Sequence, residues 1–313
     1  MSFRLPVLFT VVCGSLLALG AACTSSSDEA AGTDGTLRVH SSFSSAHVIP
    51  RTVSVWLPPG YDSTRADGYP VLYMHDGQNL FRADSANFGV EWQVDETLTK
   101  LIEAGTVPPV IVVGLHSTDR RVQEYLPDAP FRLQPNSVQR VLKNEVGQEG
   151  DSMKLRSDQY LRFLVDEVKP FVDRRYNTDP TTAHTYVAGS SMGGLISIYA
   201  LAEYPEVFAG AAALSTHWAL ARTRTDTAFA VAFREYLDGR LTELNSKRLY
   251  FDHGTRTLDS LYAPHQAIID SFLVARGFPD DQWTSRVFEG AKHHERAWAA
   301  RFDSVATFLF PTP

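Results

Sequence analysis

The sequence predicts an α/β protein in which a mostly parallel central sheet is covered by helices on both faces. Short runs at 71–74 and 110–114 are wholly apolar, which is typical of strands that are buried on both faces. These runs alternate along the chain with segments whose apolar residues recur at helical spacing. The 313 residues are 44% hydrophobic and 21% charged, and this composition excludes disorder for the bulk of the chain.

The predicted elements follow one another in a regular order. The first strands are expected at 36–41 and 52–57, and the buried strands at 71–74 and 110–114 come next. The remaining elements are a helix at 160–172, a strand at 185–188, a helix at 193–203, strands at 208–214 and 249–251, a helix at 261–275, a strand at 284–288 and a closing helix at 295–308. Ligands of such sheets bind at the carboxyl ends of the strands, so chemistry is expected just after each strand.

The first residues have the pattern of a secretory signal. Arg4 gives a positive start, residues 5–19 are mostly apolar, and Gly20-Ala21-Ala22 precede Cys23. Small residues before a cysteine resemble the bacterial lipobox, in which that cysteine is lipidated, although Leu19 stands one position further from Cys23 than is usual. The prediction is a lipoprotein signal at 1–22, a polar tether at 23–35 and a single folded domain at 36–313. Ordinary signal cleavage and an uncleaved anchor are the alternatives.

Charge and cysteine content exclude several classes of partner. The net charge of −7 and the lack of a basic run argue against nucleic acid. Both cysteines, Cys13 and Cys23, lie in the N-terminal segment, so no cysteine zinc site is possible in the body of the chain. No metal and no cofactor are expected, and contact with a membrane is expected only through the lipid anchor.

A serine motif lies between a predicted strand and a predicted helix. Residues 189–194 read Gly-Ser-Ser-Met-Gly-Gly, which contains G-x-S-x-G. Only Ser191 has glycine two positions before and two positions after it, and both glycines are expected to remove side chains that would clash around a strained turn. The motif therefore predicts Ser191 as a nucleophile, and a serine hydroxyl needs a base to act as one.

The base and the acid are expected after Ser191, in the chain order of this fold class. His293 follows the last predicted strand and is the candidate base, with His294 beside it turned to solvent. Two carboxylates follow the preceding strand, Asp252 directly and Asp259 at the start of the next helix. Spacing alone does not decide between them.

The backbone amides of Gln78 and Met192 are the candidate oxyanion donors. Met192 follows the nucleophile, and Gln78 follows Gly77 in the loop after the strand at 71–74. His75 and Asp76 are expected to fix that loop by hydrogen bonds. After the strand at 110–114, an ion pair of Glu124 with Arg120 or Arg121 is expected to brace the next loop, and substrate binding by these residues is the alternative.

Four strings together resemble the "putative esterase" family of α/β-hydrolases. They are YPVLYMHDGQNLF at 69–81, EWQVDE at 91–96, GSSMGG at 189–194 and GAKH at 290–293. The family includes feruloyl and acetyl-xylan esterases, enterochelin-type esterases, S-formylglutathione hydrolases and mycolyltransferases. The resemblance implies the α/β-hydrolase fold, Ser191 as nucleophile, His293 as base, and Gln78 and Met192 as oxyanion amides. Feruloyl esterases carry G-T-x-D for the acid, so the match favours Asp259, but two extra residues after Gly254-Thr255 keep Asp252 open.

The expected function is that of an exported serine esterase acting through an acyl-serine intermediate. The expected substrates are carbohydrate-linked acetyl or feruloyl esters or siderophore-type esters. Trp92, His217 and Trp218 are candidate substrate contacts, and the alternative for the two tryptophans is that they are core aromatics. Two alternatives are an acyltransferase that uses the same Ser-His site and a non-catalytic binding lipoprotein on a hydrolase scaffold.

Overall fold

The computed structural model describes residues 1, 27–28, 35–134, 139, 154–220 and 224–312. The signal predicted for 1–22, apart from Met1, and Cys23 lie outside the described residues. Of the tether predicted for 23–35, Ser27, Asp28 and Gly35 are described. Ser27 and Asp28 pair with a strand of the main sheet.

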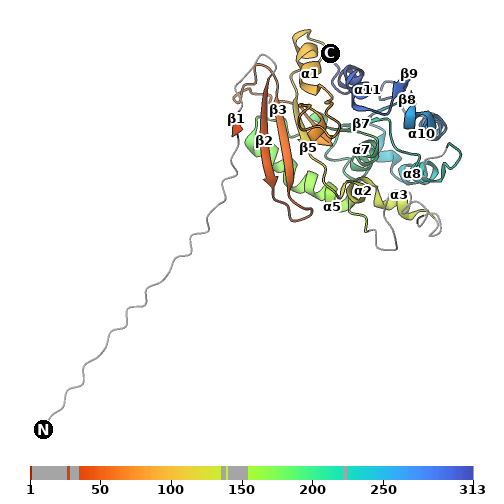
Figure 1. The fold of residues 1–313 in the computed structure, drawn as a ribbon, viewed down its shortest axis with the longest axis horizontal. Helices are drawn as coiled ribbons and strands as arrows, with labels where there is room; N and C mark the ends of the chain where they lie inside the picture. Colours follow the sequence, from red (N-terminus) through yellow and green to blue (C-terminus); the bar gives the residue numbers. More distant parts are fainter. Residues whose placement is uncertain (2–26, 29–34, 135–138, 140–153, 221–223, 313) are drawn as a thin grey trace.

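Nine strands of the described residues form one sheet, in the order β1-β2-β3-β5-β4-β6-β7-β8-β9 (Figure 1). Neighbouring strands are antiparallel from β1 to β5 and parallel from β5 to β9. This is the predicted mostly parallel sheet. The strands are β1 (Ser27–Asp28), β2 (Thr36–Phe43), β3 (Arg51–Leu57), β4 (Val71–His75), β5 (Ile111–Leu115), β6 (Thr185–Ser190), β7 (Gly210–Leu214), β8 (Arg248–Arg256) and β9 (Trp283–Lys292).

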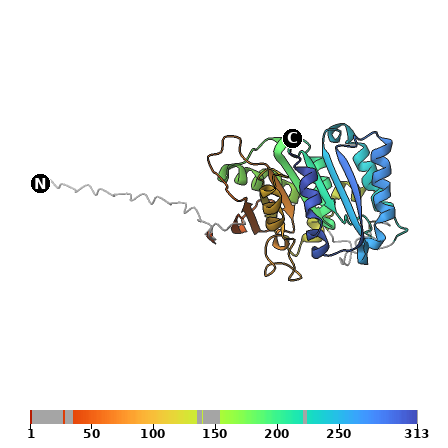
Figure 2. The ribbon, with the colours of Figure 1, turned by 90° about the horizontal axis from the view of Figure 1, so that it is seen from above.

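Helices lie on both faces of the sheet (Figure 2). The α-helices are α1 (Val94–Glu103), α2 (Arg121–Tyr125), α3 (Asp128–Arg132), α5 (Ser157–Arg162), α6 (Lys169–Arg175), α7 (Met192–Glu203), α8 (Ala228–Asp238), α9 (Leu241–Leu244), α10 (Ala263–Ala275), α11 (Glu295–Ala299) and α12 (Phe302–Leu309). The 3₁₀ segments are η1 (Gly77–Asn79), η3 (Thr182–His184) and η4 (Thr257–Leu261), and η2 (Phe163–Val168) is a π-helical segment between α5 and α6.

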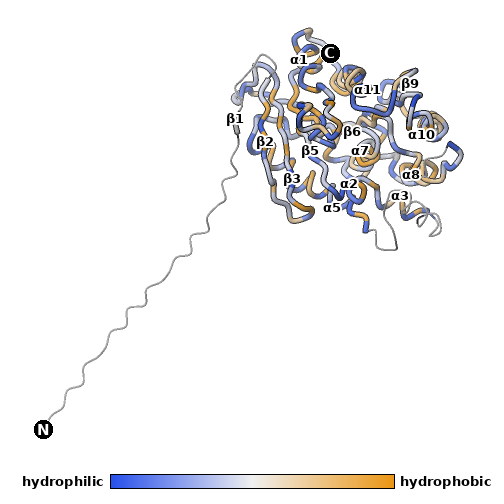
Figure 3. The backbone as a smooth tube through the Cα atoms, in the orientation of Figure 1, coloured by the Kyte–Doolittle hydropathy of each residue, from blue (hydrophilic) through white to orange (hydrophobic). Residues whose placement is uncertain are grey.

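The buried strands feed two cores, one on each face of the sheet. In β4, Val71 and Tyr73 belong to the larger core, whereas Leu72 and Met74 belong to the smaller one. This division follows from the two-residue period of a strand, and it explains why the run at 71–74 is apolar at every position. The helix α7 lies against β6 and β7, is mostly hydrophobic in Figure 3, and has all but one of its twelve residues buried.

The closing helix predicted at 295–308 is interrupted in the structure. It ends at Ala299 and restarts at Phe302, because Arg301 leaves the helical conformation with φ −133°. The guanidinium of Arg301 turns into the protein and binds Asp252. The helix predicted at 160–172 is longer than expected and runs from Ser157 to Arg175 through α5, η2 and α6.

No helix in the described part of the chain combines the length and the apolar character needed to cross a membrane.

Candidate active site

Ser191 occupies a strained turn between β6 and α7. Its backbone angles are φ 57° and ψ −120°, a conformation that costs a non-glycine residue free energy. The Ser191 amide donates to the Leu214 carbonyl at 2.8 Å, and its carbonyl accepts from the His217 amide at 3.1 Å. These two bonds, to the last residue of β7 and to the segment after it, hold the turn, so the serine lies where β6 ends.

Of the two glycines in the motif, only Gly189 is required by close contacts at this turn. A Cβ on Gly189 would lie 2.8 Å from the carbonyl carbon of Gly193, closer than real Cβ contacts. A Cβ on Gly193 would meet the Cβ of His75 at 3.4 Å, which is ordinary van der Waals contact. The expectation that both glycines prevent clashes is therefore wrong for Gly193. Gly189 faces the backbone of the first turn of α7, whereas Gly193 faces the side chains of His75 and Asp76 at the end of β4.

His293 and Asp259 come together at the carboxyl ends of two neighbouring strands. His293 follows β9 and Asp259 lies in η4, just past β8. The Nδ1 of His293 lies 2.6 Å from Oδ1 of Asp259, and the His293 amide donates to Oγ1 of Thr257 at 2.8 Å. Because a carboxylate can only accept, Nδ1 is the donor and Nε2 is left as the basic nitrogen. The rings of Tyr262 and Trp298 contact the imidazole edge to face.

Asp252, the alternative acid, faces a different partner. Its carboxylate is fully buried and accepts from Nε and Nη2 of Arg301 at 3.0 and 2.8 Å. The reason is that β8 continues past Asp252 to Arg256, so Asp252 is an interior residue of the strand. The structure thus brings Asp259, and not Asp252, to His293.

Three buried residues that the sequence reasoning did not single out connect Asp252 and Asp259, and they are Ser215, Trp298 and Arg301. The Ser215 hydroxyl donates to Asp259 and accepts from both Trp298 and Arg301. Arg301 in turn binds Asp252. We call these five residues the Ser215 cluster. Ser215 directly follows β7, so inspecting the residue after every strand would have found it.

A second cluster of hydrogen-bonded side chains holds the loop that carries Gln78. Asp76 has φ 56° and accepts from Nε and Nη2 of Arg121 at 2.7 and 2.8 Å. The Asp76 amide donates to the hydroxyl of Tyr125, and Nδ1 of His75 lies 2.7 Å from the hydroxyl of Tyr160. We call these five residues the Asp76 cluster. It fixes the loop by hydrogen bonds, as expected of His75 and Asp76.

The partners of Arg121 and Glu124 differ from the sequence expectation. Glu124 does not pair with Arg120 or Arg121, because it binds Arg51 of β3 at 2.7 and 2.8 Å in a fully buried ion pair. Arg121 is left to bind Asp76. Burial raises the pKa of the Asp76 carboxyl, but the guanidinium of Arg121, with smaller contributions from Ser117 and His75, lowers it by more in total, so this pKa lies below its usual value.

The two candidate oxyanion amides begin helical segments. Met192 is the first residue of α7 and Gln78 is the second of η1, where backbone N–H groups have no acceptor within the helix. The side chain of Gln78 is occupied by Ser117, to which Nε2 donates at 2.7 Å and from whose amide Oε1 accepts at 3.0 Å. A Cβ on Gly77 would lie 2.4 Å from the carbonyl carbon of Gly114, so only glycine allows this loop to pack on β5.

Ser191 and His293 line one pocket of about 490 Å³. Polar groups and two aromatic rings make up its wall. Its lining residues are Asp76, Asn79, Asn87, Phe88, Arg121, Ser190, Ser191, His293, His294, Glu295 and Trp298. His294 is therefore part of the wall, and its side chain also accepts a hydrogen bond from the Arg296 amide at the start of α11.

The three candidate substrate contacts do not line this pocket. Trp92 packs on Trp298 in the smaller core, and Trp218 packs in the larger core and donates to Gln266. His217 is buried, with Nδ1 2.8 Å from the hydroxyl of Tyr262. The two tryptophans serve the cores because both are nearly completely enclosed, and Trp298 is the tryptophan at the pocket.

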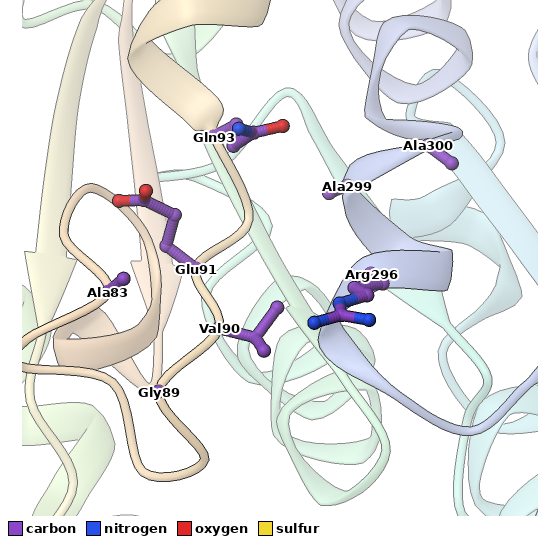
Figure 4. Close-up of a pocket in the computed structure, with 8 residues that line it drawn as sticks. All are labelled: Ala83, Gly89, Val90, Glu91, Gln93, Arg296, Ala299 and Ala300. Carbon is purple, nitrogen blue, oxygen red and sulfur yellow. The ribbon is translucent and has the colours of Figure 1, made fainter.

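A second pocket of about 440 Å³ lies between the 83–93 segment and α11 (Figure 4). Glu91 comes from that segment and Arg296 from α11. In neither pocket, nor elsewhere in the described residues, do three or more His, Cys, Asp or Glu side chains gather as a metal site would require.

The chain matches one known protein family over most of its length. The family described as "Putative esterase" matches residues 44–309. "Uncharacterized protein YbbA" of Bacillus subtilis (strain 168) is 23% identical over 264 residues, which cover 83% of this chain and 92% of YbbA. "Endo-1,4-beta-xylanase/feruloyl esterase" of Xylanibacter ruminicola is 24% identical over 161 residues, which cover 50% of this chain and 18% of that protein.

Solved structures show the same fold. A ferulic acid esterase superposes with a TM-score of 0.62 at 18% identity, covering 88% of this chain and 97% of that one. The enterobactin esterase FES of Shigella flexneri, crystallised with enterobactin, superposes with a TM-score of 0.62 at 16% identity, covering 92% of this chain and 59% of that one. Both are α/β-hydrolase-fold esterases, and the predicted fold class is confirmed.

Proposed function

The chain belongs to the esterase family, and on that premise we propose that it is a serine carboxylic-ester hydrolase working through an acyl-serine intermediate. One observation carries the proposal. Ser191 sits on a strained turn in the same pocket as His293, and His293 is hydrogen-bonded at 2.6 Å to a buried carboxylate, Asp259. A nucleophile, a base and a third group that orients the base are the parts that acyl transfer requires.

The proposed reaction has two halves. As Oγ of Ser191 attacks the ester carbonyl, Nε2 of His293 takes the serine proton, and Asp259 stabilises the imidazolium that forms. The amides of Gln78 and Met192 bind the oxyanion of the tetrahedral intermediate. His293 then protonates the leaving alcohol. In the second half His293 takes a proton from water as that water attacks the carbonyl of the acyl-serine. The bond to Oγ of Ser191 then breaks, the acid is released, and His293 returns the proton to Oγ.

The proposed substrates are carbohydrate-linked acetyl or feruloyl esters or siderophore-type esters. Fold neighbours named for ferulic acid and for enterobactin support this class. The rings of Phe88 and Trp298 and the polar groups of Asn79, Asn87 and Arg121 in the pocket wall suit an aromatic or oxygen-rich ester.

We also propose export, with lipidation at Cys23. This proposal rests on the pattern of residues 1–23, which lie outside the described structure apart from Met1. Cells fed a labelled fatty acid should label the protein and not its Cys23→Ala variant; label on both would contradict the proposal.

The function is tested by acid release from four esters. The panel holds a short-chain aryl ester, methyl ferulate, acetylated xylan and a catecholate siderophore lactone. The unmodified protein should hydrolyse at least one of them, and Ser191→Ala should lose about 10³- to 10⁶-fold in kcat, as serine hydrolases do without their nucleophile.

A phosphonate probe for reactive serines separates the two neighbouring hydroxyls. Ser190→Ala, which leaves Ser191 in place, should still be labelled, whereas Ser191→Ala should not. Full esterase activity in folded Ser191→Ala would overturn the proposed mechanism.

A further inference from the structure

Ser215 stands in an unusual place beside the proposed triad. It follows β7, is fully buried and has φ 43°, in the left-handed region that a serine adopts only at a cost. Its amide donates to the Asp252 carbonyl at 2.8 Å and to Oδ1 of Asp252 at 3.1 Å. The fold therefore holds Ser215 in a strained conformation. It lies close to Ser191, the proposed nucleophile, which follows the neighbouring strand β6.

The hydrogen bonds of the Ser215 hydroxyl fix the direction of its proton. A hydroxyl has one donor and two acceptor positions. Both acceptor positions are filled, by Nε1 of Trp298 at 3.0 Å and by Nη2 of Arg301 at 2.7 Å. The third neighbour is Oδ2 of Asp259 at 2.6 Å, which can only accept. The proton must lie between Ser215 and Asp259.

Arg301 is held from its other side. Asp252 binds it through two hydrogen bonds, and the hydroxyl of Tyr250 donates to the same carboxylate at 3.1 Å. A buried bidentate pair of this kind keeps the guanidinium in one orientation. Asp252 thus contributes to the site through Arg301 and Ser215, without touching His293.

We propose that Ser215 is a positioning residue, whose hydroxyl, directed by Arg301 and Trp298, locks the carboxylate of Asp259 toward His293. The inference rests on the proposed esterase function. With Ser215 and the Gly254 amide both donating to Oδ2, at 2.6 Å each, Oδ1 is left for the imidazole. The carboxylate cannot rotate without breaking two short bonds.

The charge state of Asp259 agrees with this role. Burial raises the pKa of its carboxyl, but His293, the Ser215 hydroxyl and the Gly254 amide lower it by more, so that pKa is below its usual value. The titratable and charged groups packed around the pair are His293 itself, Arg301 with Asp252, and Tyr262 against the imidazole. Arg301 and Asp252 compensate each other, so the Ser215 hydroxyl is the group whose removal changes the carboxylate directly.

The test compares Ser215→Ala with Tyr250→Phe. Both remove a hydroxyl that donates to a carboxylate of the Ser215 cluster, but Tyr250 binds Asp252 and not Asp259. In Ser215→Ala the Asp259–His293 pair should take up its proton at a pH higher by about one unit, since a donor to the charged carboxylate is lost. The acid limb of kcat/KM should move by that amount, with kcat about 10-fold lower and KM little changed. Tyr250→Phe should leave the acid limb where it is.

Two further measurements keep the test decisive. Ser215→Gly deletes the same hydroxyl with a residue that favours a φ of 43°, so it serves if the alanine variant fails to fold. The ring titration of His293, followed by NMR, needs no substrate and should show the same upward displacement. If the unmodified protein hydrolyses no ester but this titration moves, the proposed function fails and the positioning role stands. If neither the titration nor the acid limb moves in a folded Ser215 variant, the positioning role is overturned.

Discussion

The Asp76 cluster and the Ser215 cluster flank Ser191, and each contains an arginine bound to a carboxylate at less than 3.1 Å. In the Asp76 cluster the ion pair holds a backbone, because Asp76 itself is part of the loop that leads to Gln78. In the Ser215 cluster the ion pair of Arg301 and Asp252 does not touch the residue that it supports. It acts through the hydroxyl of Ser215, which binds the carboxylate of Asp259. Similar ion pairs can therefore support one site in two ways, by fixing the place of an amide or by fixing the charge and direction of an acid.

The largest expected effect separates the two carboxylates within the Ser215 cluster. Asp259→Asn should lower kcat by about 10²- to 10⁴-fold, because an amide holds the imidazole in the wrong tautomer. Asp252→Asn should instead lower the free energy of unfolding by about 3–5 kcal/mol, since it leaves Arg301 buried without its partner. Steady-state kinetics and urea denaturation of both variants check this. A kcat loss in Asp252→Asn that equals that of Asp259→Asn, with no loss of stability, would mean that the acids are wrongly assigned.

A smaller effect is expected from the Asp76 cluster. Asp76→Asn can keep the left-handed backbone, since asparagine tolerates it, but it removes the charge that holds Arg121. The Gln78 amide should lose its alignment, and kcat should fall about 10- to 100-fold, less than for complete loss of an oxyanion donor. The uncompensated charge of Arg121 should move the acid limb of kcat/KM to lower pH, opposite to Ser215→Ala. An upward displacement in Asp76→Asn would erase the distinction between the clusters.

The smallest expected effect is a loss in the free energy of unfolding at acid pH, and its source is His75 of the Asp76 cluster. Burial lowers the pKa of His75 to about 3, so the folded protein leaves this ring neutral where the unfolded chain binds a proton. The unfolded state then takes up more protons between pH 6.5 and 3, and stability falls as the pH falls through that window, by about 1.4 kcal/mol per unit for one such group.

His75→Gln removes the titrating ring. Urea denaturation at pH 7, 6 and 5 should show a shallower loss of stability for this variant than for the unmodified protein. Equal slopes would show that the ring is not held neutral by the fold.

The sequence was sufficient for the parts of the site that depend on local spacing. The strand-turn-helix around Ser191, the loop after β4 and the loop after β9 lie where the spacing predicts them. Asp259 and Asp252 could not be separated, because the length of β8 depends on its pairing with β9, and that pairing carries the strand past Asp252. Trp92 and Trp218 could not be assigned to the core or to the substrate cleft for a similar reason, since an isolated tryptophan in a sequence does not reveal which surface encloses it.

The break between α11 and α12 has a consequence for biosynthesis. A ribosome completes Ser191 long before it completes His293, Trp298 and Arg301, which all follow β9. While the chain is being made, the nucleophile exists without its base and without the arginine that directs Ser215. A nascent chain, or one cut short before Arg301, would carry the serine motif and yet lack a complete proposed triad environment, so the site would mature only once the chain has been made through Arg301.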